Sequence, residues 1–151
     1  MTRSTTHAQL HRGTSIRTLN VAGVTRVVAA ACVTAVGAVH LYLYENGFSA
    51  VPTIGRLFLA NVVTGACIAV MLVVDRQRWM WTALAAAYCI ATLGSFLWSV
   101  QFGLFGYQET LRGAWQERAA VVEIAGAVLS AAAAILATRA QRARSGPREA
   151  A

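Results

Sequence analysis

Four long apolar segments, separated by short polar stretches, constrain the fold of this chain more than any other feature of its sequence. They cover residues 27–44, 57–74, 81–100 and 119–138. Each has close to the roughly 20 residues that a helix, rising about 1.5 Å per residue, needs to cross about 30 Å of hydrocarbon. The sequence therefore predicts an all-α fold, an antiparallel transmembrane four-helix bundle, with spans at about 25–44, 57–74, 79–100 and 118–138.

The composition excludes an ordinary soluble domain. Hydrophobic residues make up 57% of the chain and charged residues 13%, whereas about 25% of the residues in a soluble domain are charged. The mean hydropathy is +0.53. We therefore predict a multi-pass protein of the cytoplasmic membrane with one domain, a disordered basic leader at 1–24 and a disordered basic tail at 140–151.

The positions of the arginines predict which way the bundle faces. All but three of the 13 basic residues lie before the first apolar segment, between the second and third, or after the fourth. By the positive-inside rule, both termini are cytoplasmic and the loops at 45–55 and 101–116 face outward. The second loop is long enough to hold a short helix at the membrane surface. The three exceptions are Arg56, Arg112 and Arg118.

The same arrangement accounts for the net charge of +7. A patch of arginines on a soluble fold would indicate nucleic-acid binding, but these arginines flank apolar segments. We therefore predict that the basic ends contact anionic lipid headgroups, and we predict no nucleic-acid partner.

A cleaved signal peptide is the main alternative to a first span. A basic leader precedes an apolar stretch at 27–36, and the small residues Ala35 and Gly37 resemble a cleavage site. The leader is long for a signal peptide, and the apolar segment continues past this site to Tyr44. Four spans therefore describe the sequence better than three spans behind a cleaved leader.

Small residues at a spacing of four predict how the helices meet. In lipid, where the hydrophobic effect does not drive helices together, small side chains let two backbones approach closely. We therefore expect the third and fourth helices to pack as a close pair. The stripes consist of Ala83, Ala87, Ala91, Ser95 and Ser99 in the third span, and of Ala119, Ala127 and Ala131, flanked by Gly126, Ser130 and Ala134, in the fourth.

Polar residues inside the spans are the candidates for a functional site, because each of them is costly in hydrocarbon. Glu123 lies just over one turn into the fourth span, and His40 lies about one turn from the outer end of the first. Asn61 has a similar depth in the second span, and Arg56 lies at its mouth. Since all spans cross the same two surfaces, these four residues predict an outward-facing polar binding pocket. Its predicted rim consists of Glu45, Glu117 and Arg118.

Several cofactor chemistries lack the residues that they need. The cysteines Cys32, Cys67 and Cys89 occur singly in three different spans, so the sequence has no Cys-x-x-Cys pair for disulfide exchange. A haem held across a helix bundle needs paired histidines, and only His40 lies inside a span. The sequence therefore predicts no metal, no haem and no catalytic residue, and it favours a protein that is not an enzyme.

The first span and the loop after it resemble a known group of membrane proteins. An arginine at the start of the span, a glycine and a histidine near its end, and a loop with glycine and proline are similar to the DoxX-like group of small four-helix bacterial membrane proteins. The resemblance covers about a third of the chain. It implies the four-helix architecture and, for some members, a link to quinone-dependent oxidation. The matching residues are Arg26, Gly37, His40, Gly47 and Pro52.

Three functions are compatible with these observations. The first is a structural, assembly or binding component that associates with another membrane protein or with a second copy of itself. The second is a small proton-linked transporter in which Glu123 changes its protonation and His40 relays the proton. The third is a redox subunit in which these two residues hold a quinone head group. In the simplest case the polar residues only hydrogen-bond one another and hold the bundle together.

Overall fold

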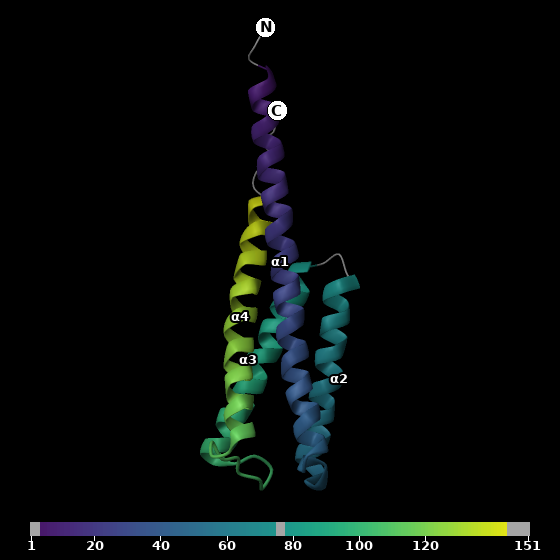
Figure 1. Cartoon of the computed structure of the whole chain (residues 1–151), viewed down its shortest axis with the longest axis vertical. Helices are drawn as coiled ribbons and strands as arrows, with labels where there is room; N and C mark the ends of the chain where they lie inside the picture. The colour runs from purple at the N-terminus through teal and green to yellow at the C-terminus, as the bar shows by residue number, and fades with distance from the viewer. Residues whose placement is uncertain (1–3, 75–77, 145–151) are drawn as a thin grey trace.

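Four long α-helices make up most of the part of the chain that the structure describes, and this confirms the all-α bundle (Figure 1). The computed structural model describes residues 4–74 and 78–144, and the side chains within 23–74 and 79–143. Within these ranges no β-strand is present. The elements are α1 (Ser4–Glu45), the short 3-10 helix η1 (Phe48–Ala50), α2 (Pro52–Val74), α3 (Arg78–Phe102) and α4 (Ala114–Arg144).

Each of the four helices contains a segment that is long and apolar enough to cross a membrane, with mean hydropathy between 1.6 and 2.5. Large apolar side chains also point away from the bundle, as at Val63, Val73 and Val128. An apolar surface of this kind is stable in contact with lipid and unfavourable in contact with water. The chain is therefore a multi-pass membrane protein. The four segments are Gly23–Glu45, Pro52–Val74, Trp79–Phe102 and Ala114–Ala143.

The helices are antiparallel, and the two ends of the bundle differ. At one end α1 begins, α2 ends, α3 begins and α4 ends (Figure 1). The opposite end, which we call the loop end, carries η1 and the segment 103–113 (Figure 1). Helix α1 packs extensively on α2 and on α4, and α3 packs extensively on α4, whereas α2 and α3 meet over a smaller area. The close pairing expected of the third and fourth helices is therefore confirmed.

Two helices extend further than the predicted spans. Helix α1 begins at Ser4, within the leader for which we expected disorder, and α4 continues to Arg144, into the expected basic tail. Once a helix exists, each added residue contributes one more hydrogen bond, and neither extension contains proline. Helix α2 begins at Pro52, because proline has no N–H to leave unpaired and suits the first turn of a helix.

The loop at 103–113 contains no helix, so the short surface helix expected there is wrong. Gly103, Phe105, Gly106 and Gly113 have positive φ angles, which a right-handed helix does not allow. Two backbone hydrogen bonds join Leu104 and Tyr107 instead, with N···O distances of 2.6 and 2.9 Å. The loop therefore folds back on itself near the end of α3.

The face that α3 buries is not the predicted small-residue stripe. Ala87, Ala91 and Ser95 are exposed. A step of four residues advances about 40° beyond a full turn of a helix with 3.6 residues per turn, so a long fourfold stripe winds off any single face. Alternating steps of three and four stay on one face, and most of the buried side chains follow that pattern, with Ala86 and Tyr88 beside them. Those that follow it are Thr82, Ala85, Cys89, Thr92 and Ser99, of which only Ser99 belongs to the predicted stripe.

The predicted stripe on α4 does pack against its neighbours. Gly126 is buried, and a Cβ atom there would lie 3.1 Å from a methyl carbon of Val36 and 3.6 Å from the sulfur of Cys89. The Ser130 hydroxyl lies 3.5 Å from the same sulfur. Small residues on α4 therefore allow α1, α3 and α4 to meet closely, as the stripe predicts.

An arginine ties α1 to the end of α2 away from the loop end. Arg26 donates hydrogen bonds from Nε to the carbonyl of Leu72 and from Nη2 to the carbonyl of Val73, both at 2.6 Å. Carbonyls in the last turn of a helix lack partners within the helix, and a cation there is favourable. The guanidinium therefore caps α2 and fixes its position on α1.

Replacing Arg26 with glutamine should lower the free energy of unfolding in detergent by about 2 kcal/mol, because two charge-assisted hydrogen bonds are lost. Thermal unfolding of the purified protein measures the change. Arg56→Gln is the matched control, since Arg56 is exposed and its removal should shift the melting temperature little. Equal melting temperatures for the two variants would contradict the capping role.

Candidate functional site

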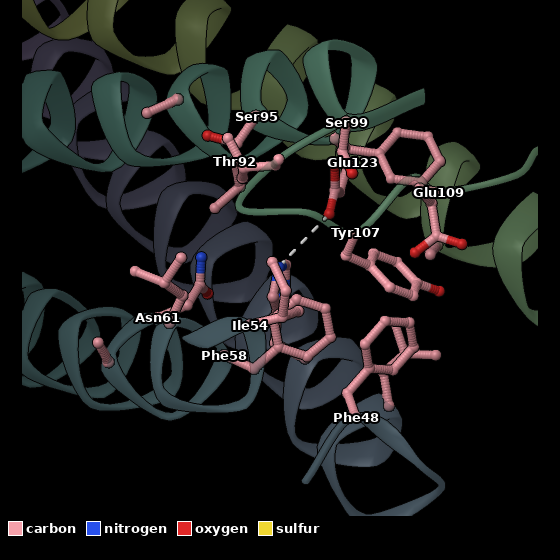
Figure 2. A pocket seen from close by; sticks show the side chains of 18 of the residues that line it. Phe48, Ile54, Phe58, Asn61, Thr92, Ser95, Ser99, Tyr107, Glu109 and Glu123 are labelled. Carbon is pink, nitrogen blue, oxygen red and sulfur yellow. Dashed lines mark ion pairs between the residues drawn. The ribbon is translucent and has the colours of Figure 1, made fainter. Parts of the chain in front are cut away.

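A cavity of about 320 Å³ lies near the loop end and is lined by residues from all four helices, from η1 and from the loop at 103–113 (Figure 2). Apolar and aromatic side chains form most of its wall, among them Phe48, Phe58 and Phe96. A small number of polar groups interrupt this wall. The polar residues with ionisable or amide side chains are His40, Asn61, Tyr88, Tyr107, Glu109, Gln116 and Glu123.

Glu123 is the most deeply buried carboxylate of the cavity. It projects from α4, and only 3% of its surface is exposed. Its Oε1 atom lies 3.7 Å from Nε2 of His40, the ion pair drawn in Figure 2. Its Oε2 atom is buried and has no hydrogen-bond partner among the described residues. One carboxylate oxygen therefore faces an imidazole, and the other is left to accept a hydrogen bond.

His40 is oriented by its own helix. Its Nδ1 atom lies 2.9 Å from the carbonyl oxygen of Val36, one turn earlier in α1. A carbonyl can only accept, so Nδ1 carries the hydrogen and Nε2 is the nitrogen presented to Glu123. The ring also packs edge-on against Phe58, with centroids 4.9 Å apart. The ring is therefore fixed with Nε2 facing the carboxyl group, at a distance that allows a charge interaction and exceeds a hydrogen bond.

Asn61 and Tyr88 connect α2 to α3 across the cavity. The Tyr88 hydroxyl donates a hydrogen bond to Oδ1 of Asn61 and also lies 3.2 Å from the Asn61 main-chain oxygen. Helix α2 accommodates the tyrosine at Gly65, where a Cβ atom would lie 2.7 Å from the Tyr88 hydroxyl oxygen. The bond uses the amide oxygen of Asn61, so the donor that this residue presents at the cavity wall is its amide N–H group.

Glu109 is a second carboxylate of the cavity wall, in the loop at 103–113. It is 9% exposed, its Oε1 accepts a hydrogen bond from the Thr110 main-chain N–H at 3.1 Å, and its own N–H donates to the Ser99 carbonyl at 3.3 Å. Burial raises the pKa of the Glu109 carboxyl above its ordinary value, and the Thr110 N–H opposes part of this shift. Burial likewise raises the pKa of Tyr107, as does its charge interaction with Glu109.

The raised pKa of Glu109 gives a pH-dependent prediction. At a pH above that pKa the folded state holds a poorly solvated carboxylate, whereas in the unfolded state the same carboxyl group titrates near its ordinary pKa of 4.5. Glu109→Gln should therefore raise the melting temperature at neutral pH, and the gain should disappear as the pH falls through the raised pKa toward 4.5. Glu117→Gln, at an exposed carboxylate, is the control. A gain that grows as the pH falls would refute the assigned direction.

Three of the four predicted pocket residues line one cavity, namely His40, Asn61 and Glu123. Arg56 does not, because it is exposed and lies five residues before Asn61, which turns it about 140° around the helix. The three predicted rim residues, Glu45, Glu117 and Arg118, are also exposed and do not line the cavity. Arg118 instead stacks over Trp115, with its guanidinium carbon 4.6 Å from the ring centroid.

Sequence reasoning missed several residues of the cavity. Tyr88 gives no signal, because an aromatic residue in a span is usually a packing residue. Glu109 gives none either, since a loop carboxylate is ordinarily solvated. The sequence predicts helix packing for Ser95 and Ser99 and does not single out Thr92. All three hydroxyl residues line the cavity.

Known proteins do not add to the description of this cavity. Comparison with protein-family models, with curated proteins and with solved structures gives no match to this chain. The resemblance to the DoxX-like group therefore remains a prediction.

Proposed function

We propose that this protein is a membrane-embedded binding component, which holds a small membrane-soluble molecule in the cavity at its loop end and catalyses no reaction. The observation that carries the proposal is the Oε2 atom of Glu123, which is buried at the cavity without a partner among the described residues. Buried polar atoms of proteins are nearly always paired. A bound molecule that donates a hydrogen bond to Oε2 supplies the missing partner.

The size and lining of the cavity support a small ligand. Ligand sites typically measure about 300–1,000 Å³ and combine a mostly apolar wall with a few polar groups that fix orientation. This cavity has about 320 Å³, aromatic walls from η1, α2 and α3, and the polar groups of His40, Asn61 and Glu123. The dimensions fit a molecule with one or two rings and a polar head group.

The exposed part of the cavity wall supports entry from the membrane. Ala60 and Thr64 on α2, and Ala91 and Ser95 on α3, line the cavity and are also exposed. These residues lie on the two helices that meet over the smallest area. The cavity therefore reaches the side of the bundle between α2 and α3, which borders lipid in a membrane. In the proposed orientation, with the arginine-rich end in the cytoplasm, the loop end faces outward.

A proton-linked transporter is the second candidate, and the His40–Glu123 pair favours it because both side chains can bind and release a proton and they face each other. Transport would also require access from the opposite end of the bundle. That half is filled by buried side chains, including Ala29, Leu72 and Ala85. The binding component therefore agrees with more of the structure than the transporter does.

Filling the cavity tests the proposal. Ala91→Trp places a large side chain at an exposed position of the cavity wall, and Ala87→Trp places the same side chain one turn away, at an exposed position that does not line it. Native mass spectrometry of protein purified gently from its membrane should detect a bound small molecule in the wild type and in Ala87→Trp, and none in Ala91→Trp.

Two outcomes would replace the proposal. A wild type that carries no more bound small molecule than Ala91→Trp, in repeated preparations, would indicate a purely structural role for the polar residues. Proton flux into proteoliposomes that disappears in Glu123→Gln would indicate the transporter.

A further inference from the structure

We infer that the ligand of this cavity is an organic cation, a lipophilic amine whose ammonium group binds Glu123. The inference rests on the proposed function and deepens it, since it assigns a charge and a chemical class to the bound molecule. It follows from the balance of charges around the cavity, from the unpartnered carboxylate oxygen and from the aromatic wall between the two carboxylates.

The charged residues of the cavity favour a cation over an anion. Two carboxylates, Glu109 and Glu123, line it, and no arginine does so among the described residues. Arg56 lies on another face of α2, and Arg118 is stacked on Trp115 outside the cavity. An anionic head group would meet two carboxylates in a partly desolvated space with only His40 as a counter-charge. Like charges in such surroundings repel strongly.

The geometry at Glu123 fits an ammonium donor. Oε1 faces Nε2 of His40 at 3.7 Å, and Oε2 lies buried with no partner. An ammonium group has several N–H donors, so it can bind Oε2 and still donate to a second acceptor. The hydroxyl groups of Ser95 and Ser99, on α3, also line the cavity (Figure 2).

A continuous row of rings joins the region of Glu123 to that of Glu109. His40 packs against Phe58 at 4.9 Å, Phe58 against Phe48 at 4.8 Å, and Phe48 against Tyr107 at 5.4 Å, each measured between ring centroids. Figure 2 shows Phe58, Phe48 and Tyr107 along one side of the cavity. Aromatic faces attract cations, and their bulk accommodates the apolar body of an amine. The wall therefore suits both parts of such a ligand.

A quinone satisfies these groups less well. Its head group offers only carbonyl oxygens, which accept hydrogen bonds from Asn61 or His40 but supply no donor to a carboxylate. With a quinone bound, Oε2 of an ionised Glu123 would stay unpaired, and only a protonated carboxyl group could donate a hydrogen bond to the quinone. The ammonium group of an amine supplies a charged hydrogen-bond donor to this oxygen.

Three probes with the same aromatic body and different head groups test the inference: naphthylethylamine as the cation, naphthylethanol as the neutral donor and naphthylacetate as the anion. Binding to full-length protein in nanodiscs is measured by calorimetry, and the signal of Ala91→Trp is subtracted as partition into lipid. The wild type should bind the amine at least about tenfold more tightly than the alcohol, and the anion most weakly. Naphthoquinone should bind more weakly than the amine.

Glu123→Gln should reduce the preference for the amine over the alcohol to about twofold or less, because the amide keeps the shape and removes the charge. Glu109→Gln, at the far end of the aromatic wall, should reduce it by a smaller factor. Since the ranking of probes by the wild type is itself a test, the inference does not depend on whether Glu123→Gln folds.

Each outcome separates the ligand class from the proposed function. Binding of naphthylacetate or naphthoquinone at least as tight as that of the amine overturns the cation and leaves the binding function intact. If none of the four probes binds the wild type more tightly than Ala91→Trp, the inference that the ligand is a cation is overturned as well. If native mass spectrometry also finds no bound molecule, the binding function fails with it.

Discussion

Replacing Gly65 with valine is expected to lower the free energy of unfolding by about 3 kcal/mol, the upper part of the range for overpacking a closely packed site. A Cβ atom at residue 65 would lie 2.7 Å from the Tyr88 hydroxyl oxygen and 3.2 Å from the Val33 carbonyl oxygen. The tyrosine cannot simply turn away, because its hydroxyl is bonded to Asn61. The substitution must therefore separate α2 from α1 or break the contact between α2 and α3.

Gly94→Val is the matched control for this change. Gly94 lies in the interior of α3, and a Cβ atom there would meet no atom within 4 Å. Both variants introduce a β-branched residue into a helix, so the propensity terms cancel. Equilibrium unfolding in mixed detergent micelles measures the difference between them. Similar stabilities for the two variants would show that the close approach at Gly65 does not limit the packing of α2.

Removing His40 alone is expected to cost about 3 kcal/mol, because His40→Leu leaves the buried Glu123 carboxyl without its facing group. The double variant His40→Leu with Glu123→Leu should recover most of that loss. Two leucines have similar volumes to the residues that they replace, and apolar replacement of a whole buried pair is often neutral or stabilising. The leucine at residue 40 also keeps a contact with Phe58, which packs on the imidazole in the native protein.

A double-mutant cycle of unfolding free energies measures the coupling between the two positions. Residues in contact typically show interaction energies of about 0.5–3 kcal/mol, and distant residues show additive effects. We expect a coupling near the upper end of this range, since both side chains are buried and their polar atoms lie 3.7 Å apart. Strict additivity would contradict a direct interaction of His40 with Glu123.

The fold could be predicted because one physical requirement dominates it. A backbone in lipid must satisfy its own hydrogen bonds, so four apolar segments of spanning length give four helices. The meeting of His40, Asn61 and Glu123 followed from depth, because residues equally far from one surface lie in one layer of an antiparallel bundle. Depth says nothing about direction around each helix axis. Arg56 has a suitable depth but points away from the cavity.

Other parts of the site depend on contacts that no local pattern encodes. The burial of Glu109 comes from a loop whose path is set by three positive-φ glycines and by its hydrogen bond to Ser99. Tyr88 reaches Asn61 because Gly65, on another helix, leaves space for it. In α3, small residues are so frequent that several faces look suitable for packing. The choice between these faces is made by the partner helices.

The small area shared by α2 and α3 leaves the position of α2 to other contacts. Helix α1 packs on α2 as extensively as it does on α4, Arg26 joins α1 to one end of α2, and η1 connects the two helices at the other end. Between α2 and α3, the Tyr88 hydroxyl bonds to Asn61 beside the cavity. The width of the cavity is therefore set mainly by how α2 packs on α1, a contact made by residues that lie largely outside the cavity wall.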